Sequence, residues 1–421
     1  MNIIKAILPS HQCWLQTLHK ISLLFFMYLS QKIFLCFSWT LLPIILRKQG
    51  ISLGAIGFTT LVYSPWALKF LYAFMVDRFY STRMGKRKSW IVPLLTVSLF
   101  MLPILALLSP QEDLTLILSA VFVLNLIFAT VDIAVDGYAT DILEPDERPW
   151  GNMIQTCGYV IGYMTGAGIF LIIYQQQGWQ TTLMIIAALQ LLIMAPIVLH
   201  KEMPPLFREK EGQTKGKGCG HESNAWSFVK QPGNLLFLSV AGLIVLSDRG
   251  GAQLRLPMVT DMGIEPLMLG KLNIWFSSPM CLFGAVMGGV LLRKLGNQKI
   301  LIVGCCIAAG VNFFSAVVFQ ASCSGWLGIG IMMGAEKLMA GIISILIYNM
   351  IMTLSVGSQS ATRYAILCSL VTLFGMGTNP IMGRLCDIAG YFNFFVGLSV
   401  SNILIIFAGT GLLKRIPKLA R

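Results

Sequence analysis

Long apolar stretches separated by short polar ones occupy almost the whole chain. Each stretch has about the 20 residues that an α-helix needs to cross the hydrocarbon core of a bilayer. The pattern therefore predicts an all-α membrane protein with twelve transmembrane helices, at residues 21–46, 54–76, 89–109, 114–143, 152–174, 180–199, 234–256, 268–292, 299–320, 325–354, 363–386 and 391–413.

One long polar stretch interrupts this pattern, from Lys201 to Gly233, directly after the sixth predicted helix. It contains Pro204-Pro205 and a Gly- and Lys-rich run from Lys215 to Gly220. We therefore predict two six-helix halves. The predicted parts are a cytoplasmic N-terminal segment (1–20), the N-terminal half (21–199), a cytoplasmic linker (200–233), the C-terminal half (234–413) and a cytoplasmic tail (414–421).

The composition excludes a soluble enzyme. Hydrophobic residues make up 56% of the 421 residues, charged residues only 12%, and the mean hydropathy is +0.75. An ordinary soluble domain has about 25% charged residues.

The net charge of +13 comes from 31 Lys and Arg against 18 Asp and Glu. Most of the basic residues fall in the N-terminal segment, in the loops after the even-numbered predicted helices and in the C-terminal tail, which all lie on one side of the membrane. The other side of the membrane has only Arg47, Lys48, Arg255, Lys271 and Arg384. Lys and Arg concentrate in cytoplasmic loops, so both termini are predicted to be cytoplasmic. The same loops account for the charge, and we expect no nucleic-acid partner.

Charged residues also occur inside the predicted spans, where each costs about 2.5–3.5 kcal/mol on insertion scales. Asp132 and Asp136 are four residues apart, on one face of the fourth helix. Two carboxylates this close repel unless a cation lies between them. Lys32 matches Asp132 in depth, about 11 or 12 residues from the cytoplasmic side, and Lys69 matches Asp136 at about 8.

The predicted C-terminal half carries two adjacent charge pairs near mid-membrane, Asp248-Arg249 and Glu336-Lys337. Neighbouring residues point about 100° apart on a helix, so we expect pairing across helices. Two interpretations stay open. The charges are structural ion pairs, or they form a proton relay (Asp132, Asp136, Asp248, Glu336) beside an anion-binding cavity whose cations are Lys32, Lys69, Arg249 and Lys337.

The end of the second predicted span leads into a basic loop, Asp77-Arg78-Phe79-Tyr80-Ser81-Thr82-Arg83-Met84-Gly85-Lys86-Arg87-Lys88. An acid followed by a basic cluster at a helix end can lock a cytoplasmic gate through ion pairs. The candidate gate residues are Asp77, Arg78, Gly85, Arg87 and Asp141. A plain cytoplasmic loop rich in Lys and Arg is the alternative.

This loop resembles the D-R-x-G-R-[RK] loop of the major facilitator superfamily, with an insertion before the glycine. Further runs are similar to its AmpG-like branch of muropeptide permeases, acetyl-CoA transporters and RhtX/FptX siderophore permeases. They are Ser64-Pro-Trp-Ala-Leu-Lys69, Asp132-Ile-Ala-Val-Asp136-Gly-Tyr-Ala-Thr-Asp141 and Ser360-Ala-Thr-Arg-Tyr364. The resemblance covers nearly the whole chain.

Within that branch, Trp150-Gly151-Asn152, Gln155 and Gly158-Tyr159 look most similar to the siderophore permeases. The resemblance implies a proton-driven importer of a ferric siderophore in the bacterial inner membrane, with a muropeptide or acetyl-CoA-type permease as the alternative. It also implies that the first, fourth, seventh and tenth helices line a central cavity, and most of the buried charges lie on them. Asp132 is the leading candidate proton carrier, with Lys32 as its partner or as a substrate contact.

Other classes fit less well. An intramembrane enzyme would need a catalytic constellation, but the sequence has no H-E-x-x-H motif and no serine in a G-x-S-x-G turn. We therefore expect no catalytic residue, no metal site and no cofactor, with the proton gradient as energy source. The expected partners are a small-molecule substrate and the lipid bilayer, and the expected state is a monomer. Only measured transport separates this reading from a receptor without flux.

Overall fold

The computed structural model describes residues 11–48, 59–205, 225–264, 268, 271–321, 325–357 and 359–416. Helices and the turns between them account for these residues, apart from one isolated antiparallel bridge between Ser81 and Gly85. Arg249 lies in a helix, but its side chain is outside the described part of the chain.

The chain divides into two compact units, one of Met1–Glu211 with Ser355–Ala365 and the other of Gly212–Leu354 with Ile366–Arg421. The boundaries of the two predicted halves stay a prediction. The segment Ser355–Ala365 is notable because it packs in the first unit although it follows a long helix of the second.

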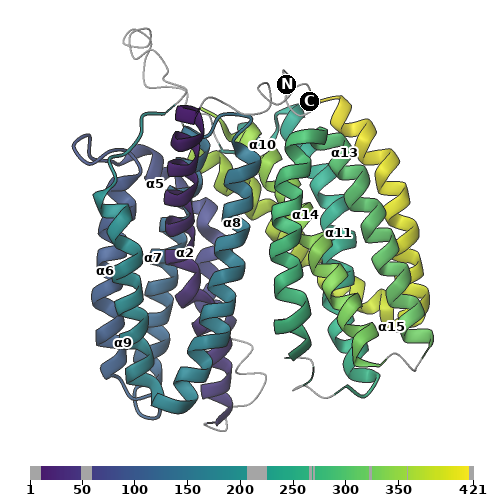
Figure 1. Ribbon diagram of the computed structural model, residues 1–421, viewed down its shortest axis with the longest axis horizontal. Helices are drawn as coiled ribbons and strands as arrows, with labels where there is room; N and C mark the ends of the chain where they lie inside the picture. The colour runs from purple at the N-terminus through teal and green to yellow at the C-terminus, as the bar shows by residue number, and fades with distance from the viewer. Residues whose placement is uncertain are drawn as a thin grey trace. The chain divides into compact units, whose positions relative to one another are not determined.

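The first unit contains the helices at the purple-to-teal end of the colour bar (Figure 1). They are α2 (His11–Lys48), η1 (Thr59–Tyr63), α4 (Ser64–Leu68), η2 (Lys69–Leu71), α5 (Ala73–Arg78), α6 (Lys88–Leu107), α7 (Leu114–Ile142), α8 (Arg148–Tyr163), η3 (Met164–Ile169) and α9 (Phe170–Leu199). Helix α2 packs against α7, α8 and α9, and α6 packs against α7 and α9. Leu24, Phe37 and Phe128 are fully buried among them.

The second predicted span is not one continuous helix. It consists of the short pieces η1, α4, η2 and α5, of which η1 and η2 are 3₁₀ turns. Pro65 lies at the start of α4, where its fixed φ and missing N–H suit a helix N-terminus. The break brings Lys69, at the start of η2, to a buried position.

The second unit contains α10 (Ala225–Val229), α11 (Pro232–Asp261), η4 (Asn273–Ser277), α13 (Ser278–Gln320), α14 (Trp326–Ser355) and α15 (Ser360–Lys414). The first residues of α15, up to Ala365, belong to the first unit. Met258, Ile329, Met332 and Phe395 are among the buried residues of its core.

Three glycines with positive φ interrupt α9, α13 and α15. Gly178, Gly296 and Gly390 have φ values of 79°, 76° and 75°, a region that glycine adopts without the clash of a β-carbon. Each lies where the sequence predicts one span to end and the next to begin. The long helices are therefore pairs of helices joined at a glycine.

Seven helices in the described part of the chain are long and apolar enough to cross a membrane. Shorter apolar helices occur at Pro232–Asp248 and Ser360–Gly375. Apolar side chains such as Phe100 and Leu192 are 67% and 70% exposed, which suits a surface that lipid covers. The all-helical membrane fold is confirmed, whereas the count of twelve and the cytoplasmic position of the termini stay predictions.

Glycines allow α8 and η3 to approach α2 closely. A β-carbon on Gly158 would lie 3.0 Å from Cβ of Tyr28, and one on Gly162 would lie 2.6 Å from Cβ of Lys32. A β-carbon on Gly168 would meet nothing within 4 Å. Small residues at four-residue spacing thus hold Tyr28 and Lys32 in place against the neighbouring helix.

We expect Gly162→Ala to destabilise the protein by about 1–3 kcal/mol, because the added methyl group overlaps the stem of Lys32 and forces the two helices apart. The measurement is the Tm of the purified protein in detergent. Gly168→Ala is the matched control and should leave Tm unchanged. Equal Tm values for the two variants would contradict the close packing of α8 against α2.

Candidate functional site

Lys69 lies between the two acids of α7. Its Nζ is 2.7 Å from Oδ2 of Asp132 and 3.4 Å from Oδ2 of Asp136. All three side chains are buried. Since α7 is continuous, the four-residue spacing brings both carboxylates to one face, and the break before η2 supplies the cation between them. The ammonium group thus offsets the repulsion that two buried carboxylates would otherwise have.

Asp132 has a second cation, on the neighbouring helix α2. Nζ of Lys32 is 3.1 Å from Oδ1 of Asp132 and 4.2 Å from the centre of the Trp66 ring. The indole N–H of Trp66 donates to Oδ1 of Asn125 at 3.0 Å. Asp132 therefore contacts two ammonium groups, one on each carboxylate oxygen.

Asp136 is held mainly by neutral donors. Its Oδ1 accepts hydrogen bonds from the hydroxyl of Tyr28 at 3.1 Å and from Nε2 of Gln155 at 3.0 Å. The carbonyl oxygen of the Gln155 side chain accepts in turn from the hydroxyl of Tyr364, at 3.3 Å. The charge of Asp136 is thus less fully compensated than that of Asp132.

Matching depths along the helices predicted two of these pairs, Lys32 with Asp132 and Lys69 with Asp136. The structure brings Lys32 to Asp132 as expected, and it brings Lys69 within reach of Asp136 but closer to Asp132. The sequence analysis missed the link from Gln155 to Asp136. The roles of all these residues in proton or substrate binding stay predictions.

A second charged cluster surrounds Arg87, whose side chain is 1% exposed. Its Nη1 is 2.8 Å from Oδ1 of Asp77, and its Nη2 is 2.9 Å from Oδ2 of Asp141. Nη2 also donates to Oγ of Ser360 at 2.7 Å, and that hydroxyl donates to Oδ1 of Asp141 at 2.5 Å. The guanidinium therefore joins the basic loop to α7 and to the segment Ser355–Ala365.

Asp77 binds the same segment directly. Its Oδ2 accepts from the backbone N–H of Thr362 at 2.8 Å and from the Thr362 hydroxyl at 2.6 Å. Burial alone would raise the pKa of Asp77, but Arg87, Lys86 and the two hydrogen bonds from Thr362 outweigh it, so the pKa lies below its ordinary value. The carboxylate thus caps the first turn of α15 in its charged form.

Of the five candidate gate residues, Asp77, Arg87 and Asp141 come together, whereas Arg78 and Gly85 do not join them. Arg78 is exposed, and its guanidinium lies 5.7 Å from the centre of the Phe79 ring. Gly85 forms the turn of the loop, with φ of +104°. Sequence reasoning missed Ser360 and Thr362 as partners, although their run was part of the family resemblance.

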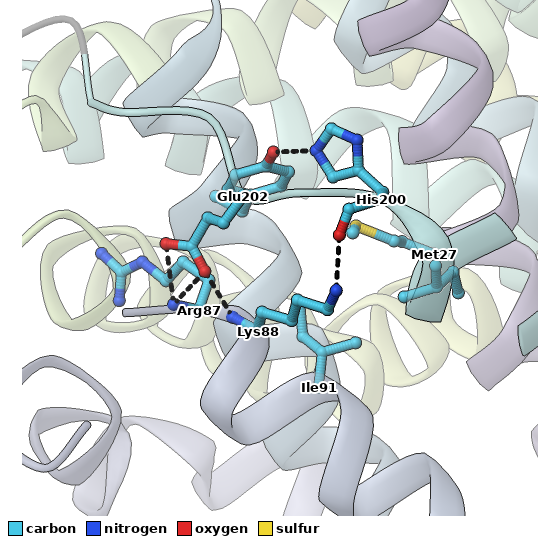
Figure 2. Close-up of a pocket in the computed structure, with 8 residues that line it drawn as sticks. Met27, Arg87, Lys88, Ile91, His200 and Glu202 are labelled. Atoms are coloured by element: carbon cyan, nitrogen blue, oxygen red, sulfur yellow. Dashed lines mark hydrogen bonds between the residues drawn. The ribbon is translucent and has the colours of Figure 1, made fainter. Parts of the chain in front are cut away.

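The first residues after α9 cap two helix ends of the first unit (Figure 2). The carboxylate of Glu202 accepts from the backbone N–H of Arg87 at 3.0 Å and from that of Lys88 at 2.7 Å. Nζ of Lys88 donates back to the carbonyl groups of Val198 and His200, at 2.6 and 2.5 Å. These bonds satisfy free backbone groups at the start of α6 and the end of α9 and fix Arg87 in place.

The charges in the second unit are arranged differently from the prediction. Nζ of Lys337 is 3.0 Å from Oε1 of its neighbour Glu336, so this pair forms within one helix, because the flexible lysine stem folds back. The expected pairing across helices was wrong for Lys337. The side chain of Arg249 lies outside the described part of the chain, and Asp248 is on the same helix, α11.

The sequence analysis placed Arg255 at the outer end of the seventh predicted span and gave it no partner. Helix α11 continues to Asp261, and Arg255 is 3% exposed within it. Its guanidinium donates to Ser315 at 3.0 Å and to Asn312, lies 5.3 Å from the centre of the Phe395 ring, and has its Nη1 3.9 Å from Oε2 of Glu336. Arg255 is therefore a cation that reaches Glu336 from another helix.

The family model described as Major Facilitator Superfamily matches residues 21–362. The anhydromuropeptide permease of Escherichia coli is 24% identical over 356 residues, which cover 83% of this chain and 70% of the permease.

Solved structures share the fold at low sequence identity. The fucose:proton symporter FucP of E. coli matches with a TM-score of 0.69 and 14% identity, over 93% of this chain and 98% of that one. The human organic anion transporter TETRAN matches with a TM-score of 0.61 and 14% identity, over 93% of this chain and 99% of that one.

We expect Asp77→Asn to lower Tm, because the change leaves Arg87 buried with one anionic partner fewer, a loss of about 3 kcal/mol or more. A carboxylate whose pKa is lowered stabilises the fold above its ordinary pKa and loses that contribution as pH falls through the lowered value. The difference in Tm between wild type and variant should therefore be constant from about pH 5 to pH 8 and shrink below about pH 4. A difference that grows on acidification would contradict the charged state of Asp77.

Proposed function

The chain belongs to the Major Facilitator Superfamily and is a multi-pass secondary transporter, and from that premise we propose that it imports an anhydromuropeptide across the bacterial inner membrane, driven by protons. The observation that carries the substrate class is the similarity to the E. coli anhydromuropeptide permease over 83% of this chain. The matches reported above lend no support to the siderophore expected from the sequence. The alternative expectation, a muropeptide permease, is therefore the better supported one.

Buried cations suit such a substrate. A muropeptide combines sugar rings with the carboxylates of its peptide, and a carboxylate is held well by buried ammonium or guanidinium groups. In the first unit Lys32 lies against Trp66, a cation beside an aromatic ring on which a sugar can pack. In the second unit Lys337 and Arg255 flank Glu336, which makes these two the candidate anion contacts there.

Asp136 is the stronger candidate for the coupling proton. Asp132 contacts two ammonium groups, which favour its charged form, whereas Asp136 shares one at 3.4 Å and otherwise accepts from neutral donors. A proton on Asp136 leaves Lys69 to Asp132, so no cation loses its partner. The geometry thus supports Asp136, one helical turn after Asp132, as the proton carrier, in place of the leading candidate from the sequence.

The cluster around Arg87 is the candidate cytoplasmic gate. It holds the segment Ser355–Ala365 in the first unit through Asp77 and Asp141. This segment connects two parts of the second unit in sequence, so its release and rebinding would accompany alternating access.

Uptake by cells tests this function. In E. coli lacking its own anhydromuropeptide permease, expression of this chain should restore accumulation of a radiolabelled anhydromuropeptide, and a protonophore should abolish it. Cells with an empty vector are the control. A well-expressed protein that accumulates a ferric siderophore and no muropeptide would contradict the proposed substrate.

A further inference from the structure

Gln155 connects a buried acid to a distant segment of the chain. Its Nε2 donates to Oδ1 of Asp136, and its Oε1 accepts from the hydroxyl of Tyr364. Gln155 lies on α8, Asp136 on α7, and Tyr364, which is fully buried, on the first turns of α15. The amide is thus oriented from both sides, with a carboxylate at its nitrogen and a phenol at its oxygen.

Tyr364 belongs to the same short segment that the Arg87 cluster holds. Ser360 and Thr362, four and two residues earlier, bind Asp141 and Asp77. The segment Ser355–Ala365 is therefore bound to the rest of the first unit by carboxylates at Ser360 and Thr362 and by the Gln155 amide at Tyr364. The Gln155 amide connects the segment to Asp136.

We infer that Gln155 is a positioning residue that transmits the charge state of Asp136 to the segment Ser355–Ala365. The inference rests on the proposed function, in which Asp136 takes up the coupling proton. The uncharged side chain of Gln155 would then connect the proposed proton site at Asp136 to the candidate gate.

The hydrogen-bond donors and acceptors around Asp136 give the reason. The titratable and charged groups about it are Tyr28 and Lys32 on α2, Lys69 on η2 and Asp132 on α7. A proton on Oδ2 would point at the ammonium group of Lys69, which has no lone pair to accept it. A proton on Oδ1 can be donated to the hydroxyl oxygen of Tyr28, or to Gln155 if the amide turns its oxygen toward Asp136.

Tyr364 then loses the Gln155 oxygen as an acceptor. Once the amide has turned, Nε2 of Gln155 faces the Tyr364 hydroxyl, so the phenol must change from donor to acceptor. An amide N–H donating to a phenol oxygen forms a weaker bond than a phenol O–H donating to an amide oxygen. If the amide does not turn, its bond to Asp136 is no longer charge-assisted and holds the amide more weakly. In both cases the attachment at Tyr364 weakens when Asp136 is neutral, and the segment Ser355–Ala365 opens more often.

Hydrogen–deuterium exchange of the purified full chain tests this coupling, with Asp136→Asn as the neutral form of the acid. We expect the peptide covering residues 355–365 to exchange about fivefold faster in Asp136→Asn than in wild type, as the loss of one ordering hydrogen bond implies. Tyr364→Phe should accelerate exchange similarly, and adding Asp136→Asn to it should have no further effect.

Tyr28→Phe is the matched control. It removes a hydroxyl from the same oxygen of Asp136, but Tyr28 lies on α2 and takes no part in the Gln155–Tyr364 bond. In that background Asp136→Asn should still accelerate exchange of the segment. If Tyr364→Phe does not fold, Gln155→Met breaks the same chain and should give the same non-additivity.

Two results would overturn the inference. One is unchanged exchange of residues 355–365 in Asp136→Asn, and the other is an effect of Asp136→Asn that is equally large with Tyr364→Phe present. The experiment contains no substrate, so a failure of muropeptide uptake would count against the proposed function alone. Flat exchange with intact proton-driven uptake would count against the Gln155 connection alone.

Discussion

The ammonium group of Lys69, held between the carboxylates of Asp132 and Asp136, is the interaction on which the first unit depends. Buried charges of one sign are costly, so two acids on one face of α7 require a cation from elsewhere. The broken second span supplies it, because η2 begins at Lys69. The glycines of α8 and η3 let α2 come close enough for Lys32 and Tyr28 to complete the cluster.

A second set of charges gives the cluster its connection to the rest of the chain. Arg87 is fully buried between Asp77 and Asp141, and it is fixed at the start of α6 by Glu202. Both acids also bind the segment Ser355–Ala365, and Tyr364 of this segment leads back through Gln155 to Asp136. The proposed proton site and the candidate gate are thus hydrogen-bonded to the same short segment within the first unit.

Helical periodicity and depth in the membrane predicted the positions of the charged residues within the apolar spans. The shared face of Asp132 and Asp136 follows from their spacing on α7, and the partnership of Lys32 with Asp132 follows from equal depth. Contacts at helix ends outside the apolar spans gave no such signal, as with Glu202 at the start of α6 or Thr362 at Asp77. Arg255 was misplaced because α11 extends beyond its apolar core. The proposed substrate class depended on resemblance alone, and the similarity to the anhydromuropeptide permease favours muropeptides over siderophores.

The central claim is that Asp136 couples proton movement to substrate movement. The most direct measurement is anhydromuropeptide uptake by proteoliposomes with and without an inward proton gradient, for wild type, Asp136→Asn and the exposed control Asp146→Asn. The account predicts that wild type and Asp146→Asn concentrate the substrate when the gradient is imposed. Asp136→Asn should exchange substrate across the membrane at equilibrium but fail to concentrate it. Gradient-driven accumulation by Asp136→Asn at the wild-type level would contradict the account.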